Sequence, residues 1–240
     1  MRPWLLLLML TTIAQARPNI SHFKSIYFIH LKGEGTVVVN HKAHAGIKVT
    51  QVRTQVPQAK IFAKDHTLFI DTPKGSKVHV SLRHIERITV GDQVKLQAQH
   101  IGIHHLFVAH ANHRHHLLTR IRSLHSVVVQ GSAFVRMMWL DTTLLSAHLS
   151  NQAKLRLVGH ADRMVVKLKD HARLIAPFFH VKRIWAIAQD HAAADLFPVK
   201  LLHAYAKDHS QLRYYHYLSK SSGYFDSYDF ANILYVIPTH

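Results

Sequence analysis

The chain contains no cysteine among its 240 residues. This absence excludes disulfide bonds, a thiol nucleophile and a zinc–thiolate site, and it excludes lipid attachment at a lipobox cysteine. Glycine is scarce, with nine residues, and only two of the 13 acidic residues are glutamate (Glu34 and Glu86). The sequence also shows no motif typical of a Ser-His-Asp catalytic triad and no glycine-rich phosphate-binding loop. These absences argue against the common forms of nucleophilic and phosphate-transfer chemistry.

Positive charge is abundant: 30 Lys and Arg give a formal net charge of +17 with His neutral, and the pI is near 10.3. The 24 histidines would add further charge in mild acid. Such a balance indicates attraction to anionic partners. We expect acidic polysaccharide, lipopolysaccharide or an envelope protein rather than nucleic acid. The alternative is a background of scattered basic residues with no dedicated partner, because no run consists of Lys and Arg alone.

Residues 1–16 resemble a short secretory signal in composition. Arg2 supplies the positive start, Trp4 to Ile13 forms a short apolar run, and Ala14-Gln15-Ala16 is a small-x-small cleavage site. Cleavage would remove Arg2 and leave a net charge of +16. We therefore expect a protein in the periplasm, on the outer-membrane surface or outside the cell; an uncleaved anchor is the alternative. No later stretch is long and apolar enough to cross a membrane.

A repeat of about 20 residues organises the chain between Gly91 and Arg213. Small or acidic residues that tolerate turns recur at spacings of 20, 19, 20, 19, 20 and 18: Asp92, Asn112, Gly131, Asn151, Asp170, Asp190 and Asp208. Before each turn the apolar residues alternate with a period of two, which is typical of strands and not of helices. A fixed period with strand-like alternation indicates a solenoid.

The predicted fold is therefore all-β: a right-handed parallel β-helix with about 20 residues per coil, capped at both ends. The residues predicted to point into its core are Val127, Leu145, Leu149, Leu155, Met164, Val166, Leu168, Leu174, Ile184, Leu202 and Leu212. The turn residues are predicted to stack at one corner. Unrelated amphipathic strands in a sandwich would not keep this spacing.

We expect one domain over residues 17–240, after the signal peptide at 1–16. Residues 17–84 lack the strict period and are predicted to form an N-terminal cap with irregular coils. Residues 85–213 would form the regular coils, and 214–240 a C-terminal cap. That last segment holds six of the eight tyrosines. The tyrosines would either close the core with amphipathic rings or form a sugar-binding platform, and the cap is favoured.

Several segments resemble a known family, the putative auto-transporter adhesin head-GIN domain. They are Phe23-Lys24-Ser25-Ile26, Gly35 to Val39, Lys64 to Ile70, Val78-His79-Val80, Ile85 to Gly91 and Ser222 to Phe230. The resemblance covers about residues 22–230. It implies a secreted or envelope β-solenoid with no established activity. Turns of the type Ser-Gly-Ala-Gly-Asp are typical of that family, whereas this chain has only nine glycines and uses Asp-His and Asn.

Histidine-based metal binding is one functional hypothesis. Asp170-His171, Asp190-His191 and Asp208-His209 recur at one turn, so their side chains should form a ladder along one edge. A carboxylate next to an imidazole can orient it for metal binding. His113 and His115 lie on one strand face and could chelate zinc, copper or nickel. The weak metal candidates are thus His113, His115, His171, His191 and His209, against the simpler interpretation of repeated turn residues on an exposed edge.

Catalysis on acidic polysaccharide, by a lyase or a hydrolase, is the other alternative. Glycoside hydrolysis requires paired carboxylates, and stacking would bring Asp170, Asp190 and Asp208 together, with Asp141 and Asp162 as a weaker pair. We favour a non-catalytic, adhesin-like solenoid that uses a basic, histidine-rich surface. No catalytic residue and no cofactor is predicted, and the sequence leaves the oligomeric state open.

Overall fold

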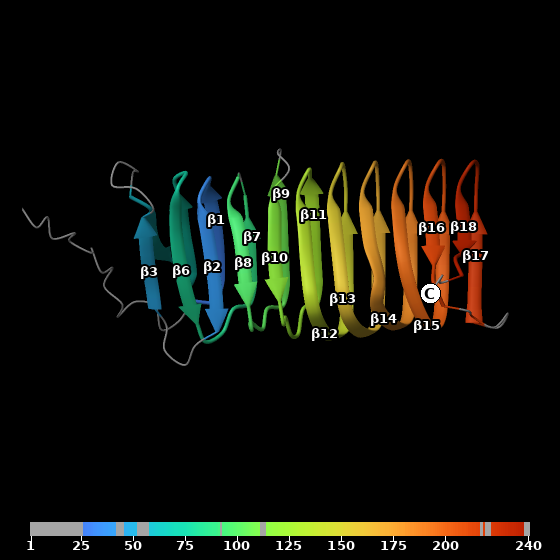
Figure 1. The fold of residues 1–240 in the computed structure, drawn as a ribbon, viewed down its shortest axis with the longest axis horizontal. Helices are drawn as coiled ribbons and strands as arrows, with labels where there is room; N and C mark the ends of the chain where they lie inside the picture. The colour runs from blue at the N-terminus through green and yellow to red at the C-terminus, as the bar shows by residue number, and fades with distance from the viewer. Residues whose placement is uncertain are drawn as a thin grey trace, which may run out of the picture.

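The computed structural model describes residues 26–41, 46–51, 58–91, 93–110, 114–216, 218 and 222–237. The predicted signal peptide, the turn residues Asp92 and Asn112, and the metal candidate His113 lie outside these residues. Within them, no helix is long and apolar enough to cross a membrane. The described chain is an elongated β-solenoid in which one coil stacks on the next along the long axis (Figure 1). This confirms the predicted all-β fold.

Each coil contributes strands to two sheets that face each other across the core. In sheet 1 the strands pair in the order β5 (Thr67–Thr72), β1 (Phe28–Gly33), β7 (Arg87–Val90), β9 (His105–His110), β11 (Ser126–Gly131), the second halves of β12 (Phe134–Leu149), β13 (Lys154–Leu168), β14 (Arg173–Ala188) and β15 (Ala193–Ala206), and β17 (Gly223–Ser227). All these pairings are parallel, as a β-helix requires.

Sheet 2 is built from the strands that follow the tight turn. Its order is β6 (Ser76–Leu82), β2 (Thr36–His41), β8 (Lys95–Gln99), β10 (His115–Thr119), the first halves of β12 to β15, β16 (Gln211–Tyr214) and β18 (Asn232–Tyr235). The strands β12 to β15 therefore run through both sheets and bend between them, at the bottom of Figure 1. We call this side, opposite the tight turns, the bend edge.

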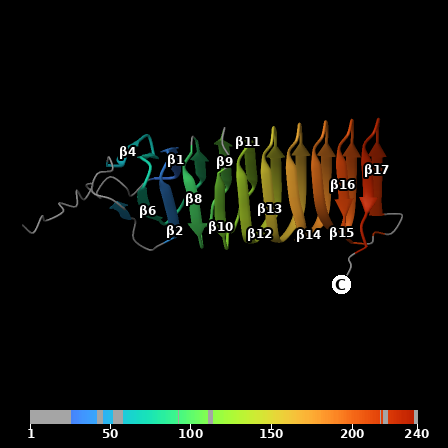
Figure 2. The ribbon, with the colours of Figure 1, turned by 45° about the horizontal axis from the view of Figure 1, so that its top comes forward.

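The N-terminal coils are stacked out of chain order. Strands β1 and β2 lie between the coil of β5 and β6 and the coil of β7 and β8. Two further strands, β3 (Gly46–Gln51) and β4 (Lys60–Lys64), pair antiparallel with β6 and β5 and cover that end (Figure 2). A tight turn at Asp65 and His66, with φ of 47° and 60°, joins β4 to β5 as a hairpin. Antiparallel strands end the stack because they interrupt its parallel pattern.

The core lies between the two sheets and consists of the apolar side chains at alternate strand positions, as predicted. All eleven residues predicted to point inward are at most 2 % exposed. The intervening positions, such as Lys154 and Lys167, are exposed. Residues 223–235, within the predicted C-terminal cap, form one more parallel coil through β17 and β18. The proposed domain limits remain predictions.

The predicted corner is confirmed from Gly131 onward. Asn151, Asp170, Asp190 and Asp208 all have φ near +60°, and the residue after each donates a backbone hydrogen bond to the previous coil. The predicted corner residue Asn112 lies outside the described residues, and the described residue that pairs with Gly131 is His110. After the turn, the regular pairing between these two coils resumes where His116 pairs with Val135. Five residues separate His110 from His116 but only three separate Gly131 from Val135, so this coil contains an insertion of two residues.

Candidate functional site

The bend edge holds a row of polar side chains on successive coils. Arg122, Asp141 and His160 occupy equivalent positions on three successive coils. Two adjoining depressions of about 730 and 620 Å³ share these three residues. Together they form what we call the bend-edge groove, which runs along the solenoid from His100 to Lys182.

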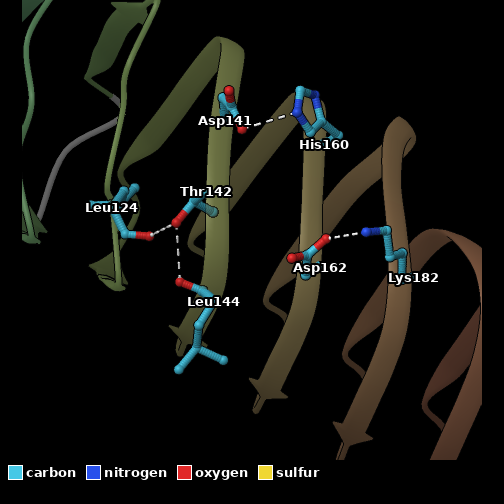
Figure 3. Close-up of polar contacts among 7 residues, drawn as sticks. All are labelled: Leu124, Asp141, Thr142, Leu144, His160, Asp162 and Lys182. Atoms are coloured by element: carbon cyan, nitrogen blue, oxygen red, sulfur yellow. Dashed lines mark hydrogen bonds and ion pairs between the residues drawn. The ribbon is translucent and has the colours of Figure 1, made fainter.

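An imidazole–carboxylate contact and an ion pair cross between coils in this groove, as Figure 3 shows. The Nε2 atom of His160 lies 2.9 Å from Oδ1 of Asp141, and Nζ of Lys182 lies 2.6 Å from Oδ1 of Asp162. Both pairs are exposed on at least half of each side chain. Beneath them the Thr142 hydroxyl donates to the Leu124 carbonyl at 2.9 Å (Figure 3). The groove therefore has a hydrogen-bonded floor and an exposed, polar rim.

Each of the two carboxylates in the groove, Asp141 and Asp162, contacts a cationic or protonatable side chain. The hydrogen bond and the charge of Lys182 lower the pKa of Asp162, so its carboxylate stays ionised. A general acid for glycoside cleavage needs a raised pKa. Asp141 is already engaged by His160. The groove is equipped to bind polar groups, with donors and acceptors that alternate along it.

The Asp corner, defined by Asn151, Asp170, Asp190 and Asp208, uses its carboxylates structurally. Oδ2 of each aspartate accepts a hydrogen bond from the backbone N–H of the turn residue one coil before, at 2.8 Å for Asp170, 3.1 Å for Asp190 and 3.2 Å for Asp208. The same residues hold the left-handed backbone of the turn. These aspartates serve as turn residues and do not line the bend-edge groove.

The histidines of this corner stack instead of converging. The rings of His171, His191 and His209 are 4.9 and 5.0 Å apart between centroids, with planes within 3° of parallel. The lone pairs of stacked rings point in parallel directions, whereas a metal ion needs them about 2.0 Å from one point. No group of three or more metal-ligating side chains occurs in the described part of the chain. Of the other candidates, His115 is exposed on sheet 2 beside Phe134, at 5.0 Å between rings.

Basic residues cluster on the outer face of sheet 2. Arg136 pairs in register with Arg156, and Lys154 pairs with Arg173. We call these four residues the sheet 2 basic cluster. Arg173 lies 3.9 Å from the buried carboxylate of Asp195. On sheet 1, Arg163 pairs with Arg183 in the same way.

Aromatic rings at the C-terminal end also stack along the axis. Trp185, His203 and Tyr224 form one such column, with centroids 5.6 and 4.6 Å apart. Tyr214 contacts Phe225 and Tyr235 at 5.4 Å. In the Trp185 column His203 is stacked between the other two rings, whereas Tyr224 at the end of the column is 60 % exposed.

Comparison with known proteins places the chain in a family. The family model described as "Putative auto-transporter adhesin, head GIN domain" matches residues 27–216. The chain belongs to this head GIN domain family. The resemblance recognised in the sequence is therefore confirmed over most of the solenoid. Among curated proteins, none matches the chain.

Solved structures share the fold of this head GIN domain at low sequence identity. A putative adhesin from Parabacteroides merdae ATCC 43184 is 13 % identical, with 88 % of this chain and 92 % of that chain covered and a TM-score of 0.73. A putative lipid binding protein from Parabacteroides distasonis ATCC 8503 is 12 % identical, with 88 % and 93 % covered and a TM-score of 0.72. A putative adhesin from Bacteroides fragilis NCTC 9343 is 13 % identical, with 89 % and 93 % covered and a TM-score of 0.64.

The sequence analysis did not single out Trp139 or the arginines of the bend edge. His100, Arg120 and Trp139 have φ of 53°, 54° and 61° and recur at spacings of 20 and 19 residues. The period of the Asp corner is thus repeated at a second turn in three successive coils. This signal was present in the sequence, but the residues at the second turn differ too much in type to reveal it.

Proposed function

We propose that this head GIN domain protein is a non-catalytic, adhesin-like binding protein of the cell envelope or the extracellular space. Its predicted leader would direct export, and its basic, histidine-rich surface would contact anionic polymers outside the membrane. Acidic polysaccharide and lipopolysaccharide carry the matching charge. Membership of an adhesin family supports the location and the binding role.

One observation carries the proposal: like charges are stacked in register in the sheet 2 basic cluster. Arg136 lies one coil from Arg156, and Lys154 lies one coil from Arg173, a spacing of about 4.8 Å. Like charges directly opposite on neighbouring strands destabilise a sheet. Within the described residues, no ion pair relieves Arg136, Lys154 or Arg156, so an external polyanion would relieve the repulsion.

The groove chemistry supports binding over catalysis. Asp141 and Asp162 lie in an open groove, each beside a cationic or protonatable partner, and the pKa of Asp162 is lowered. A carboxylate that stays ionised can accept hydrogen bonds from hydroxyl groups but cannot act as a general acid. This arrangement favours recognition of a polar polymer.

Retention on heparin and on anionic vesicles tests the proposal. We expect strong retention at low salt that falls steeply as salt rises, because attraction is screened beyond about 8 Å at physiological ionic strength. Retention should increase from pH 7.5 to 5.5 as exposed histidines gain protons. His105 and His148 would contribute less, because burial and nearby basic residues lower the pKa of each. The vesicle arm matters because one solved relative is described as lipid binding.

Matched variants locate the binding face. Replacing Arg136, Lys154 and Arg156 with Gln should shift elution to clearly lower salt. The control variant, R163Q with R183Q and K167Q, removes the same number of charges from sheet 1. Equal shifts for the two variants would show that only net charge matters. Salt-insensitive binding, or no retention in low salt at pH 5.5, would overturn the proposal.

A further inference from the structure

Trp139 occupies an unusual place in the bend edge. Met137 pairs with Leu157 and Leu140 pairs with Gly159, so Met138 and Trp139 face a single residue, Val158. This is a β-bulge, a feature that re-aims a side chain. Trp139 is 65 % exposed and has φ of +61°. A bulky residue is rare in this conformation, so the position costs conformational energy.

The ring of Trp139 is left uncovered where other rings in the solenoid are stacked. Trp185 is covered by His203 one coil away, and His171 is covered by His191. The next coil offers Gly159 beside the bulge, and Trp139 has no stacking partner among the described residues. A Cβ at Gly159 would lie 2.1 Å from the Leu140 carbonyl oxygen, so this position requires glycine. The requirement for glycine thus leaves the position next to the bulge, Gly159, without a side chain.

Polar groups of the bend-edge groove surround this ring. Trp139 lines the depression of about 730 Å³ together with Arg120, Arg122, Asp141 and His160. Nη1 of Arg120 contacts Nε2 of His100 at 2.6 Å, which holds the guanidinium at the rim. Arg122 lines both depressions. An exposed aromatic face, two guanidinium groups and a carboxylate–imidazole pair therefore lie in one concave site.

We propose that this site is a subsite for one acidic pyranose, such as a uronic acid residue, of a longer acidic glycan. The apolar C–H face of the sugar would pack on the Trp139 ring. Arg120 and Arg122 would pair with its carboxylate, and Asp141 and His160 would hydrogen-bond its hydroxyl groups. This inference rests on the proposed function, because it names the sugar-specific part of the polyanion binding surface. A lipid phosphate would use the arginines but not the ring.

Tryptophan fluorescence tests the site directly. The chain has three tryptophans, so the variant W4F/W185F leaves Trp139 as the only one. We expect a saturable change in its emission with oligogalacturonate at 0.3 M NaCl, a concentration chosen to screen the sheet 2 basic cluster. Tripolyphosphate has the charge without the sugar ring and should give no such change. No response to oligogalacturonate, or an equal response to tripolyphosphate, would overturn the subsite.

Variants separate the subsite from the basic face. W139N suits the left-handed backbone, so we expect an unchanged or higher melting temperature and about tenfold weaker oligogalacturonate binding by calorimetry. F178A is the control, since Phe178 is an aromatic 61 % exposed on β14. The R136Q/K154Q/R156Q variant should keep oligogalacturonate binding at 0.3 M NaCl. If R136Q/K154Q/R156Q leaves heparin retention unchanged while W139N still weakens oligogalacturonate binding, the basic-face proposal fails and the subsite stands. If W139N binds oligogalacturonate as tightly as the unmodified chain, the subsite fails.

Discussion

The imidazole rings of His110 and His116 lie face to face inside the solenoid, with centroids 4.7 Å apart and planes 5° apart. Both residues are buried. His116 pairs with Val135 and so takes an inward position that neighbouring coils fill with an apolar residue. Its Nδ1 accepts a hydrogen bond from the Leu96 N–H at 3.2 Å. Burial, then the charges of His110, His115 and Arg114, lower the pKa of His116 to about 3.

Acid should therefore destabilise this protein through His116. The unfolded chain binds a proton near pH 6.5 while the folded chain does not, so this contribution to stability is present above pH 6.5 and is lost as the pH falls toward 3. Urea unfolding at pH 7.5, 6 and 5 measures the slope. In H116N, which keeps an acceptor for the Leu96 N–H but does not titrate, the slope should be shallower. The exposed H115N is the control, and equal slopes for H116N and the unmodified chain would exclude this role.

Two adjacent valines test the inward pleat of β13. Val166 is fully buried, whereas Val165 points outward and is half-buried. V166A should reduce the free energy of unfolding by about 1 to 4 kcal/mol because it leaves a cavity. V165A makes the same chemical change on the other face and should cost clearly less. Denaturant unfolding compares them, and equal costs would show that the alternation is misplaced by one residue.

Asp190 should tolerate substitutions according to both of its roles in the corner. It has φ of +62°, and its carboxylate accepts from the Asp170 N–H at 3.1 Å. Asn satisfies both requirements and Gly only the first, whereas Ala satisfies neither. We expect melting temperatures in the order D190N, D190G, D190A, with D190A lower in stability by about 1 to 3 kcal/mol. If D190A and D190N had the same melting temperature, the stability of the corner would not depend on the Asp190 side chain.

Replacing a buried aspartate, Asp195, should cost much more stability than replacing an exposed one, Asp162. The side chain of Asp195 is 7 % exposed; it pairs with Arg213 at 2.7 Å and accepts from the Tyr215 hydroxyl at 3.2 Å. D195N should cost about 1 to 3 kcal/mol, since it weakens hydrogen bonds in a buried place. D162N breaks the exposed pair with Lys182 and should leave the melting temperature unchanged. Thermal melts of the two variants measure this difference. An unchanged melting temperature for D195N would contradict the prediction.

The regular part of the solenoid was predictable from sequence because its coils obey a local rule. The alternation that buries Leu155 and Val166 follows from the two-residue period of a strand. The spacing of Asn151, Asp170 and Asp190 follows from the need for residues that accept a left-handed turn. Each of these features depends on residues close together in the chain and is repeated by the neighbouring coil.

Tertiary structure alone decided the rest. The insertion between His110 and His116 is visible only when Gly131 and Val135 supply the register of the next coil. Strands β1 and β2 lie between later coils because pairing in the stack need not follow chain order. The bend-edge groove joins Arg122, Asp141 and His160, which are 19 residues apart in sequence and become neighbours through stacking. Trp139 is exposed because its coil has one residue more than the next at the bend, a difference between two coils that neither coil reveals by itself.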